Sequence, residues 1–195
     1  MSKKIFNFNQ DIQDIITKEK LELLVISYGG SASNLLTKYL EKNNYRCRTP
    51  LWKKILCHCP RYIDVDIPII YIYDDPIKSF VSMKKRGAGI WDVNQKKLSN
   101  NLNTKLSDEN LLKLMIDQFN VWTSVKRNNV LIIKTNELFK QDIVNKLENF
   151  LKKKIFHFPI KYKSPKTTTK DMEEFKLTNL YKKYKVEIDT INKYN

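Results

Sequence analysis

Residues 21–40 read LELLVISYGGSASNLLTKYL, and this stretch decides the fold that we predict for the chain. The run Leu21–Ile26 is short, apolar and partly β-branched, which is typical of a strand that is buried on both faces. A polar turn, YGGSASN at 28–34, follows the strand. Beyond the turn, apolar residues from Leu35 to Leu40 recur on one helical face. The stretch therefore predicts a strand, a tight turn and a helix in direct succession.

The turn at 28–34 carries two of the four glycines of the chain, Gly29 and Gly30. Glycine tolerates a positive φ and lets the backbone approach a ligand closely, so the turn can direct its N–H groups at an anion on the helix N-terminus. We interpret it as a phosphate-binding loop; the alternative is that its glycines and serines only cap the helix. It is not a Walker A loop, because no lysine follows it and Asn34 and Leu35 occupy that region.

Composition and charge narrow the class of protein. With 195 residues, of which 42% are hydrophobic, the chain is long enough for one well-buried domain, which we place at 1–195. Lys and Arg exceed Asp and Glu by fifteen, which favours nucleic acid, a phosphorylated cofactor or an acidic membrane surface as partner. Abundant Lys, Asn and Ile are also typical of AT-rich genomes, so we give this charge little weight. No apolar run approaches the roughly 20 residues that span a bilayer, and we expect a soluble protein.

The three cysteines are Cys47, Cys57 and Cys59. The spacing in Cys57-His58-Cys59 is too tight for the two-residue spacer of a zinc knuckle, so we predict no metal site. An odd number of thiols and an N-terminus unlike a signal sequence indicate a reducing compartment such as the cytoplasm.

The rest of the chain alternates strand-like and helix-like patterns. Further strands are predicted at Trp52–Cys57, Ile67–Tyr73 and Val130–Lys134. Further helices are predicted at Ile77–Lys85, after a Ser107 cap with apolar residues from Leu111 to Trp122, at Ile143–Lys153 and at Met172–Ile191. We expect an N-terminal helix or strap over 1–20, a mobile surface loop over 90–107 after Gly87 and Gly89, and a C-terminal extension and helix over 160–195, extended in Ile160–Lys170. This order predicts an α/β fold of three layers around a mainly parallel sheet.

Ligands of such sheets bind beyond the carboxyl ends of the strands. Three polar elements are expected to meet at that edge: the Gly29–Asn34 loop, His58 after the second strand, and Asp74–Ser82 after the third. Although a lone histidine is more often structural than catalytic, the position of His58 at a strand end makes it a candidate acid or base. His157 lies between two phenylalanines, and we interpret it as a packed or partly exposed residue without a functional role.

The order of these segments resembles the sulfotransferase family, P-loop-related enzymes that use 3′-phosphoadenosine 5′-phosphosulfate. Residues 29–34 stand in register with the family's Pro-Lys-Ser-Gly-Thr/Ser-Thr/Asn loop. The family's His-Leu-Pro, which bears the catalytic base, is matched by His58-Cys59-Pro60. Its Arg-Asn-Pro, with a Ser eight residues past the Arg, is matched in frame by Asp74-Asp75-Pro76 and Ser82. A helix with a Trp, a strand and Glu-Asp-Leu are similar to Trp122, VLIIK at 130–134 and Asn136-Glu137-Leu138, so the resemblance covers about 21–153.

The resemblance implies a P-loop NTPase-like fold and an enzyme that transfers a sulfuryl group from a 3′-phosphoadenosine 5′-phosphosulfate-type donor to a hydroxyl or amine acceptor, with no metal. His58 would then be the catalytic base. The donor would be held by Gly29, Gly30, Ser31, Ala32, Ser33, Asn34 and Ser82.

The chain departs from the family pattern where the donor binds. Gly30 replaces the loop lysine, Ala32 the loop glycine, Asp74 the arginine that pairs with the 3′-phosphate, and Leu35 an aromatic residue near the adenine; no C-terminal Arg-Lys-Gly motif is evident. Positive charge could instead come from Lys78, Lys84, Lys85 or Arg86. Two alternatives therefore stay open: a catalytically inactive nucleotide- or partner-binding protein on the same fold and, from the net charge, a basic nucleic-acid-binding protein.

Overall fold

Three parallel strands form the centre of the computed structural model, which describes residues 8–47, 56–101, 107–156 and 167–194. The strands are β1 (Leu24–Ile26), β2 (Ile69–Tyr73) and β3 (Val130–Lys134), and they lie side by side in that order. Leu24 pairs with Ile69, and Ile69 pairs with Val130, so all three strands start level with one another. The α/β class and the parallel sheet are confirmed, although β1 begins three residues later than predicted.

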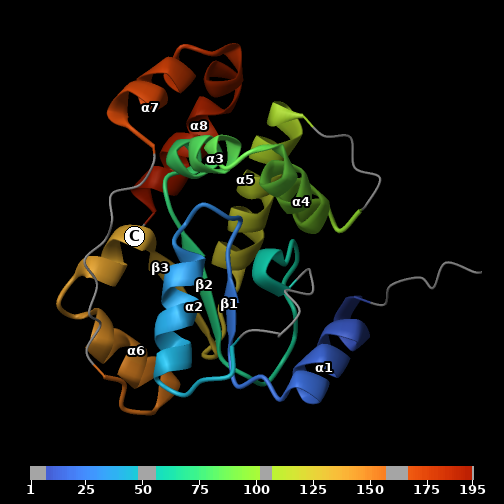
Figure 1. Ribbon diagram of the computed structural model, residues 1–195, viewed down its shortest axis with the longest axis vertical. Coiled ribbons are helices and arrows are strands. Elements are labelled where there is room, and N and C mark those ends of the chain that lie inside the picture. Colours follow the sequence, from blue (N-terminus) through green and yellow to red (C-terminus); the bar gives the residue numbers. More distant parts are fainter. Residues whose placement is uncertain (1–7, 48–55, 102–106, 157–166, 195) are drawn as a thin grey trace, which may run out of the picture.

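Helices cover both faces of the sheet (Figure 1). Along β1 and β2 every residue is buried, and alternate side chains enter two separate apolar cores. One core contains Trp122 and residues of α1, α3, α5 and α8, and the other contains residues of α2 and α6. The helices are α1 (Phe8–Glu19), α2 (Ser33–Lys42), α3 (Pro76–Lys85), α4 (Ala88–Ser99), α5 (Asp108–Ser124), α6 (Ile143–Leu151), α7 (Thr169–Lys176) and α8 (Asn179–Lys193), with short 3₁₀ turns η1 (Leu56–His58) and η2 (Thr135–Phe139).

Helices α3 and α5 begin at the side-chain caps that their sequences indicate. The Asp75 carboxylate accepts from Ile77 N–H (2.7 Å) and Lys78 N–H (3.1 Å) ahead of Pro76, and the Ser107 hydroxyl accepts from Asn110 N–H (3.0 Å). The N-terminal strap is the helix α1, whose side chains Ile12 and Ile16 are buried, while 1–7 lie outside the described residues.

Two predictions of irregular structure are wrong. Most of the expected loop at 90–107 is the helix α4, with only 102–106 outside the described residues. Its buried face carries Asn94 and Gln95 as well as Leu98, so the apolar periodicity that marks a helix is weak. Buried Gln95 accepts from Ser107 N–H (3.2 Å) and thereby ties α4 to the start of α5. Likewise, Thr169 and Lys170, expected to be extended, open α7.

Two predictions of regular structure also fail in part. The strand expected at Trp52–Cys57 is a 3₁₀ turn at Leu56–His58, and 52–55 lie outside the described residues. Cys57 O does accept from Ser27 N–H (2.9 Å) along the edge of β1, but the next acceptor there, Ser27 O, bonds to the His58 ring instead of continuing a ladder. The single helix expected at Met172–Ile191 is divided into α7 and α8, because Thr178 starts a new helix by accepting from Tyr181 N–H (3.2 Å). In the described residues, no helix is both long and apolar enough to cross a membrane.

Candidate functional site

The loop between β1 and α2 is held in an unusual backbone conformation against α3 and α4. Gly29 (φ 98°), Gly30 (φ 72°) and Ala32 (φ 58°) all have positive φ. A Cβ on Gly30 would lie 2.7 Å from both Cα and the carbonyl oxygen of Ser79 in α3. A Cβ on Gly29 would lie 2.7 Å from Asn94 Nδ2 in α4. The two glycines are therefore required both by conformation and by the close approach of their neighbours.

Five consecutive backbone N–H groups of this loop, those of residues 30–34, have no hydrogen-bond acceptor in the part of the chain that the structure describes. The flanking groups are paired: Gly29 N–H donates to Ser27 Oγ (3.2 Å), and Leu35 N–H donates to Ala32 O (2.9 Å). No side chain caps α2, whose N-cap residue is Ala32. Free N–H groups at a turn with positive φ and at a helix N-terminus are the donors that bind anions in proteins. The capping alternative has correspondingly little support here.

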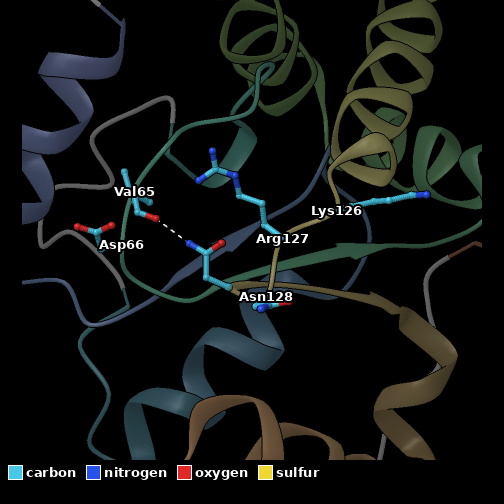
Figure 2. A pocket seen from close by; sticks show the side chains of 6 residues that line it. Val65, Asp66, Lys126, Arg127 and Asn128 are labelled. Atoms are coloured by element: carbon cyan, nitrogen blue, oxygen red, sulfur yellow. Dashed lines mark hydrogen bonds between the residues drawn. The ribbon is translucent and has the colours of Figure 1, made fainter.

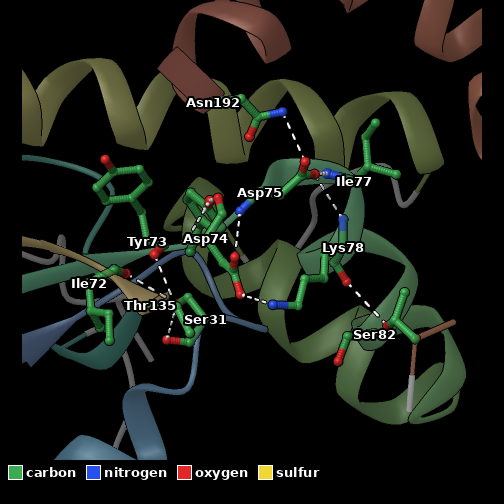
Figure 3. Close-up of polar contacts among 12 residues, drawn as sticks. Ser31, Ile72, Tyr73, Asp74, Asp75, Ile77, Lys78, Ser82, Thr135 and Asn192 are labelled. Atoms are coloured by element: carbon green, nitrogen blue, oxygen red, sulfur yellow. Dashed lines mark hydrogen bonds and ion pairs between the residues drawn. The ribbon is translucent and has the colours of Figure 1, made fainter. Parts of the chain in front are cut away.

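The two loop serines differ in what their hydroxyls do. Ser31 is fully buried, and its hydroxyl donates to Ile72 O of β2 (3.1 Å), while its own carbonyl accepts from the Thr135 hydroxyl (2.9 Å) (Figure 3). Ser33 is partly exposed, and its hydroxyl accepts from that of Ser27 (3.1 Å). Ser31 therefore fastens the loop to the sheet, and Ser33 has the hydroxyl that solvent can reach.

We expect alanine substitution of Ser31 to affect mainly the stability of the fold, and substitution of Ser33 to affect mainly nucleotide binding. Ser31→Ala leaves Ile72 O without its hydroxyl donor and should lower the free energy of unfolding by about 1–3 kcal/mol. Ser33→Ala should leave the melting temperature almost unchanged but weaken stabilisation by nucleotide. Thermal melts of both variants, with and without adenosine 3′,5′-bisphosphate, measure the two effects. Equal loss of stability in both variants would contradict this division of roles.

His58 lies beside the loop, at the carboxyl end of β1. Its Nδ1 is 2.7 Å from Ser27 O, and because a carbonyl oxygen can only accept, Nδ1 carries the hydrogen. Whenever the ring is neutral, Nε2 is therefore the nitrogen without hydrogen, and it can take a proton. The ring also faces the loop, since its Cε1 would lie 3.4 Å from a Cβ on Gly29. The structure thus brings together two of the predicted elements, His58 and the loop.

Helix α5 fixes the chain on the far side of His58. Trp122 Nε1 (2.9 Å) and Gln118 Nε2 (2.8 Å) both donate to Cys59 O. Both side chains are buried, and Gln118 also donates to Ser27 O at 3.4 Å. The resemblance points to Trp122, but the sequence gives no signal for Gln118. Together these bonds hold His58 on a rigid support.

The carboxylate of Asp74 is neutralised by a neighbouring ammonium group. Its Oδ2 lies 2.9 Å from Lys78 Nζ, with 10% of the aspartate side chain and 26% of the lysine side chain exposed (Figure 3). Its backbone N–H donates to the Tyr28 hydroxyl (3.0 Å), which in turn donates to Asp74 O. Burial, with help from the charges of Asp74 and Asp75, holds the pKa of Tyr28 well above its usual value. The β2–α3 turn is therefore tied to the loop through a neutral tyrosine.

The remaining polar residues of α3 and the C-terminus extend this edge. Ser82 is buried, and its hydroxyl accepts from Arg86 Nη2 (3.2 Å). Asp75 Oδ2 accepts from Asn192 Nδ2 (2.9 Å), which fastens α8 over the start of α3 (Figure 3). Lys84 and Lys85 are paired with Asp108 (2.6 Å) and Asp171 (2.5 Å). Of the four cations considered from the sequence, Lys78 is the one bound to Asp74, and Arg86 is the one next to Ser82.

A separate hollow of about 460 Å³ lies at the opposite, amino end of the sheet (Figure 2). It is lined by Val65, Asp66, Lys126, Arg127, Asn128 and Asn129. Asn129 Nδ2 donates to Val65 O (2.6 Å), and Arg127 is paired with Asp64 (2.5 Å). None of the residues predicted to act in the site lines this hollow. Within the described ranges, no group of His, Cys, Asp and Glu residues could hold a metal ion, and His157 lies outside those ranges.

No protein-family model, no curated protein and no solved structure matches this chain. The resemblance to sulfotransferases therefore rests on the order of the motifs, and the function must be argued from the residues of the site.

Proposed function

We propose that this protein is a sulfotransferase-like enzyme. Its β1–α2 loop binds the phosphate of a donor of the 3′-phosphoadenosine 5′-phosphosulfate type, and His58 activates a hydroxyl or amine acceptor. The observation that carries the proposal is that a histidine with one committed ring nitrogen faces a loop with five N–H groups that have no acceptor among the described residues. A base next to an anion site is what transfer between an anionic donor and a protonated acceptor requires.

The roles of the residues follow from the chemistry of an in-line displacement at sulfur. The acceptor oxygen or nitrogen forms a bond to sulfur while the bond from sulfur to the 5′-phosphate oxygen breaks. His58 Nε2 takes the acceptor proton, and the hydrogen bond from Nδ1 to Ser27 O keeps the ring in the reactive tautomer. The N–H groups of the loop stabilise the negative charge that develops on the departing phosphate.

A second candidate is a protein of the same fold that binds a nucleotide without transferring a group. The pairing of Asp74 with Lys78 favours it, because this pair places a neutralised carboxylate where the family has a free cation. The two candidates separate in one experiment with ³⁵S-labelled donor and a mixture of phenols, sugars and primary amines. Labelled product together with stoichiometric bisphosphate supports the enzyme, binding without product supports the second candidate, and absence of binding at millimolar concentration contradicts both.

We expect Asp74→Asn to tighten binding of adenosine 3′,5′-bisphosphate. The asparagine oxygen can still accept from Asp75 N–H, a bond of 2.8 Å in the wild type, but the carboxylate charge beside Lys78 is lost. The 3′-phosphate is then no longer repelled by that charge, which corresponds to roughly a tenfold gain in affinity. Isothermal titration should show this gain for the bisphosphate and little change for adenosine 5′-monophosphate.

Asp64→Asn is the matched control. It makes the same change in net charge and releases Arg127 at the amino end of the sheet, away from the loop. Equal gains from Asp64→Asn and Asp74→Asn would mean that net charge alone drives binding. A gain with Asp74→Asn that is the same for both nucleotides would place the effect away from the 3′-phosphate.

A further inference from the structure

We propose that Cys57 is a modification site: a reactive thiolate, held by Lys97 and His58, that peroxides oxidise to a sulfenic acid. This inference goes beyond the proposed function and does not depend on it. It concerns a cluster of one nucleophile and two basic side chains from η1 and α4, and the transfer chemistry above uses neither Cys57 nor Lys97.

The geometry of the cluster favours the ionised sulfur. Lys97 Nζ lies 3.8 Å from Cys57 Sγ, and the two side chains come from segments forty residues apart in the chain. Cys57 and Lys97 are both partly buried, so the ammonium is screened less by water than a fully exposed one. An ammonium in contact with sulfur and an adjacent imidazole form the electropositive, partly accessible environment in which cysteines react.

The charges around the sulfur outweigh the effect of its burial. Burial alone acts to raise the pKa of the Cys57 thiol, but the charge of His58, a hydrogen bond with His58 and the charge of Lys97 together lower it to about 6. Among the residues that the structure describes, the titratable groups whose charges act on this sulfur are His58, Lys97 and Cys59. At neutral pH the thiolate is therefore the main form of Cys57.

The other two cysteines are shielded. Cys59 is fully buried and its thiol donates to Arg61 O (3.1 Å), and burial raises its pKa to about 12. Cys47 is also buried, with its thiol donating to Thr37 O (3.6 Å). Modification should consequently be confined to Cys57.

The peroxide is the oxidant that accepts the two electrons lost by the Cys57 sulfur. The Cys57 thiolate attacks one oxygen of hydrogen peroxide, an S–O bond forms, and the O–O bond breaks. The departing hydroxide takes a proton from solvent and leaves as water, so sulfur loses two electrons and the peroxide gains them. The thiolate charge that Lys97 and His58 stabilise is removed when the product is the neutral sulfenic acid.

The test measures alkylation of Cys57 in the full chain, without nucleotide, so that it can fail independently of the proposed function. Rates of iodoacetamide labelling, followed by mass spectrometry with fragmentation to separate Cys57 from Cys59, should rise with pH around a midpoint near 6. Lys97→Gln should move the midpoint upward by about one pH unit. Lys97→Arg should restore it, and Lys96→Gln, which removes a charge from the neighbouring position of α4, should leave it unchanged.

Peroxide treatment followed by dimedone should label Cys57 and neither Cys47 nor Cys59. A midpoint near 9, the ordinary value for a thiol, would overturn the proposal. So would a midpoint that Lys97→Gln does not move, or labelling of Cys47 or Cys59 at the rate of Cys57. If Lys97→Gln fails to fold, the wild-type midpoint and the labelling pattern of the three cysteines still decide the proposal.

Discussion

Gly30→Ala should lower the free energy of unfolding by roughly 2–4 kcal/mol and abolish stabilisation by nucleotide. An L-residue in a left-handed conformation costs about 1–2 kcal/mol. The new Cβ would in addition lie 2.7 Å from two backbone atoms of Ser79, so α3 or the loop must move. For a domain of this length the melting temperature should fall by about 10 °C. Thermal melts with and without adenosine 3′,5′-bisphosphate measure both effects.

The variant Gly87→Ala separates the cost of the contact with Ser79 from the cost of the positive φ. Gly87 also has a positive φ (99°), but no atom lies within 4 Å of the position of its Cβ. This variant should lose only the conformational part of the stability and should keep its response to nucleotide. Equal losses in the two variants would mean that the contact with Ser79 is unimportant. The same contact explains why no residue with a side chain fits at position 30, because its Cβ would meet the backbone of α3.

The second large effect is expected from His58→Asn, which should reduce the rate of sulfuryl transfer by roughly 10²–10⁴-fold, the usual contribution of a general base. Asparagine can donate to Ser27 O in place of Nδ1, so the segment that carries it stays in position. Binding of adenosine 3′,5′-bisphosphate should therefore be unchanged. The measurement is single-turnover transfer from labelled donor to the best acceptor of the mixture described above. A rate within tenfold of the wild type would remove His58 from the mechanism.

The sequence predicts most reliably those elements whose signals are local. The strand Val130–Lys134 is observed with its predicted bounds, and α3 and α5 begin at the predicted residues or one residue away, because apolar patterns and cap residues lie within each segment. Helix α4 is missed because its buried Asn94 and Gln95 contact other helices and hide the apolar period.

The general location of the candidate site is predicted because its signals are also local. The glycines and His58 can be recognised one at a time, and parallel strands bring them to one edge. The partners of the polar groups depend on long-range packing and cannot be read from a local pattern. Ser31 donates to Ile72, forty-one residues away, and so has a structural hydroxyl, while Lys78 is one of four equivalent candidates until the structure pairs it with Asp74.

The central claim, that the N–H groups of the β1–α2 loop bind the phosphate of a nucleotide, can be tested through the glycines. The chain has four, so selective ¹⁵N-glycine labelling gives four amide signals. Gly29 and Gly30 lie in the loop, whereas Gly87 and Gly89 are exposed at the junction of α3 and α4 and serve as internal controls. On titration with adenosine 3′,5′-bisphosphate, we predict that the Gly29 and Gly30 signals shift and saturate while those of Gly87 and Gly89 stay in place. Four unmoved signals at millimolar nucleotide would contradict the claim.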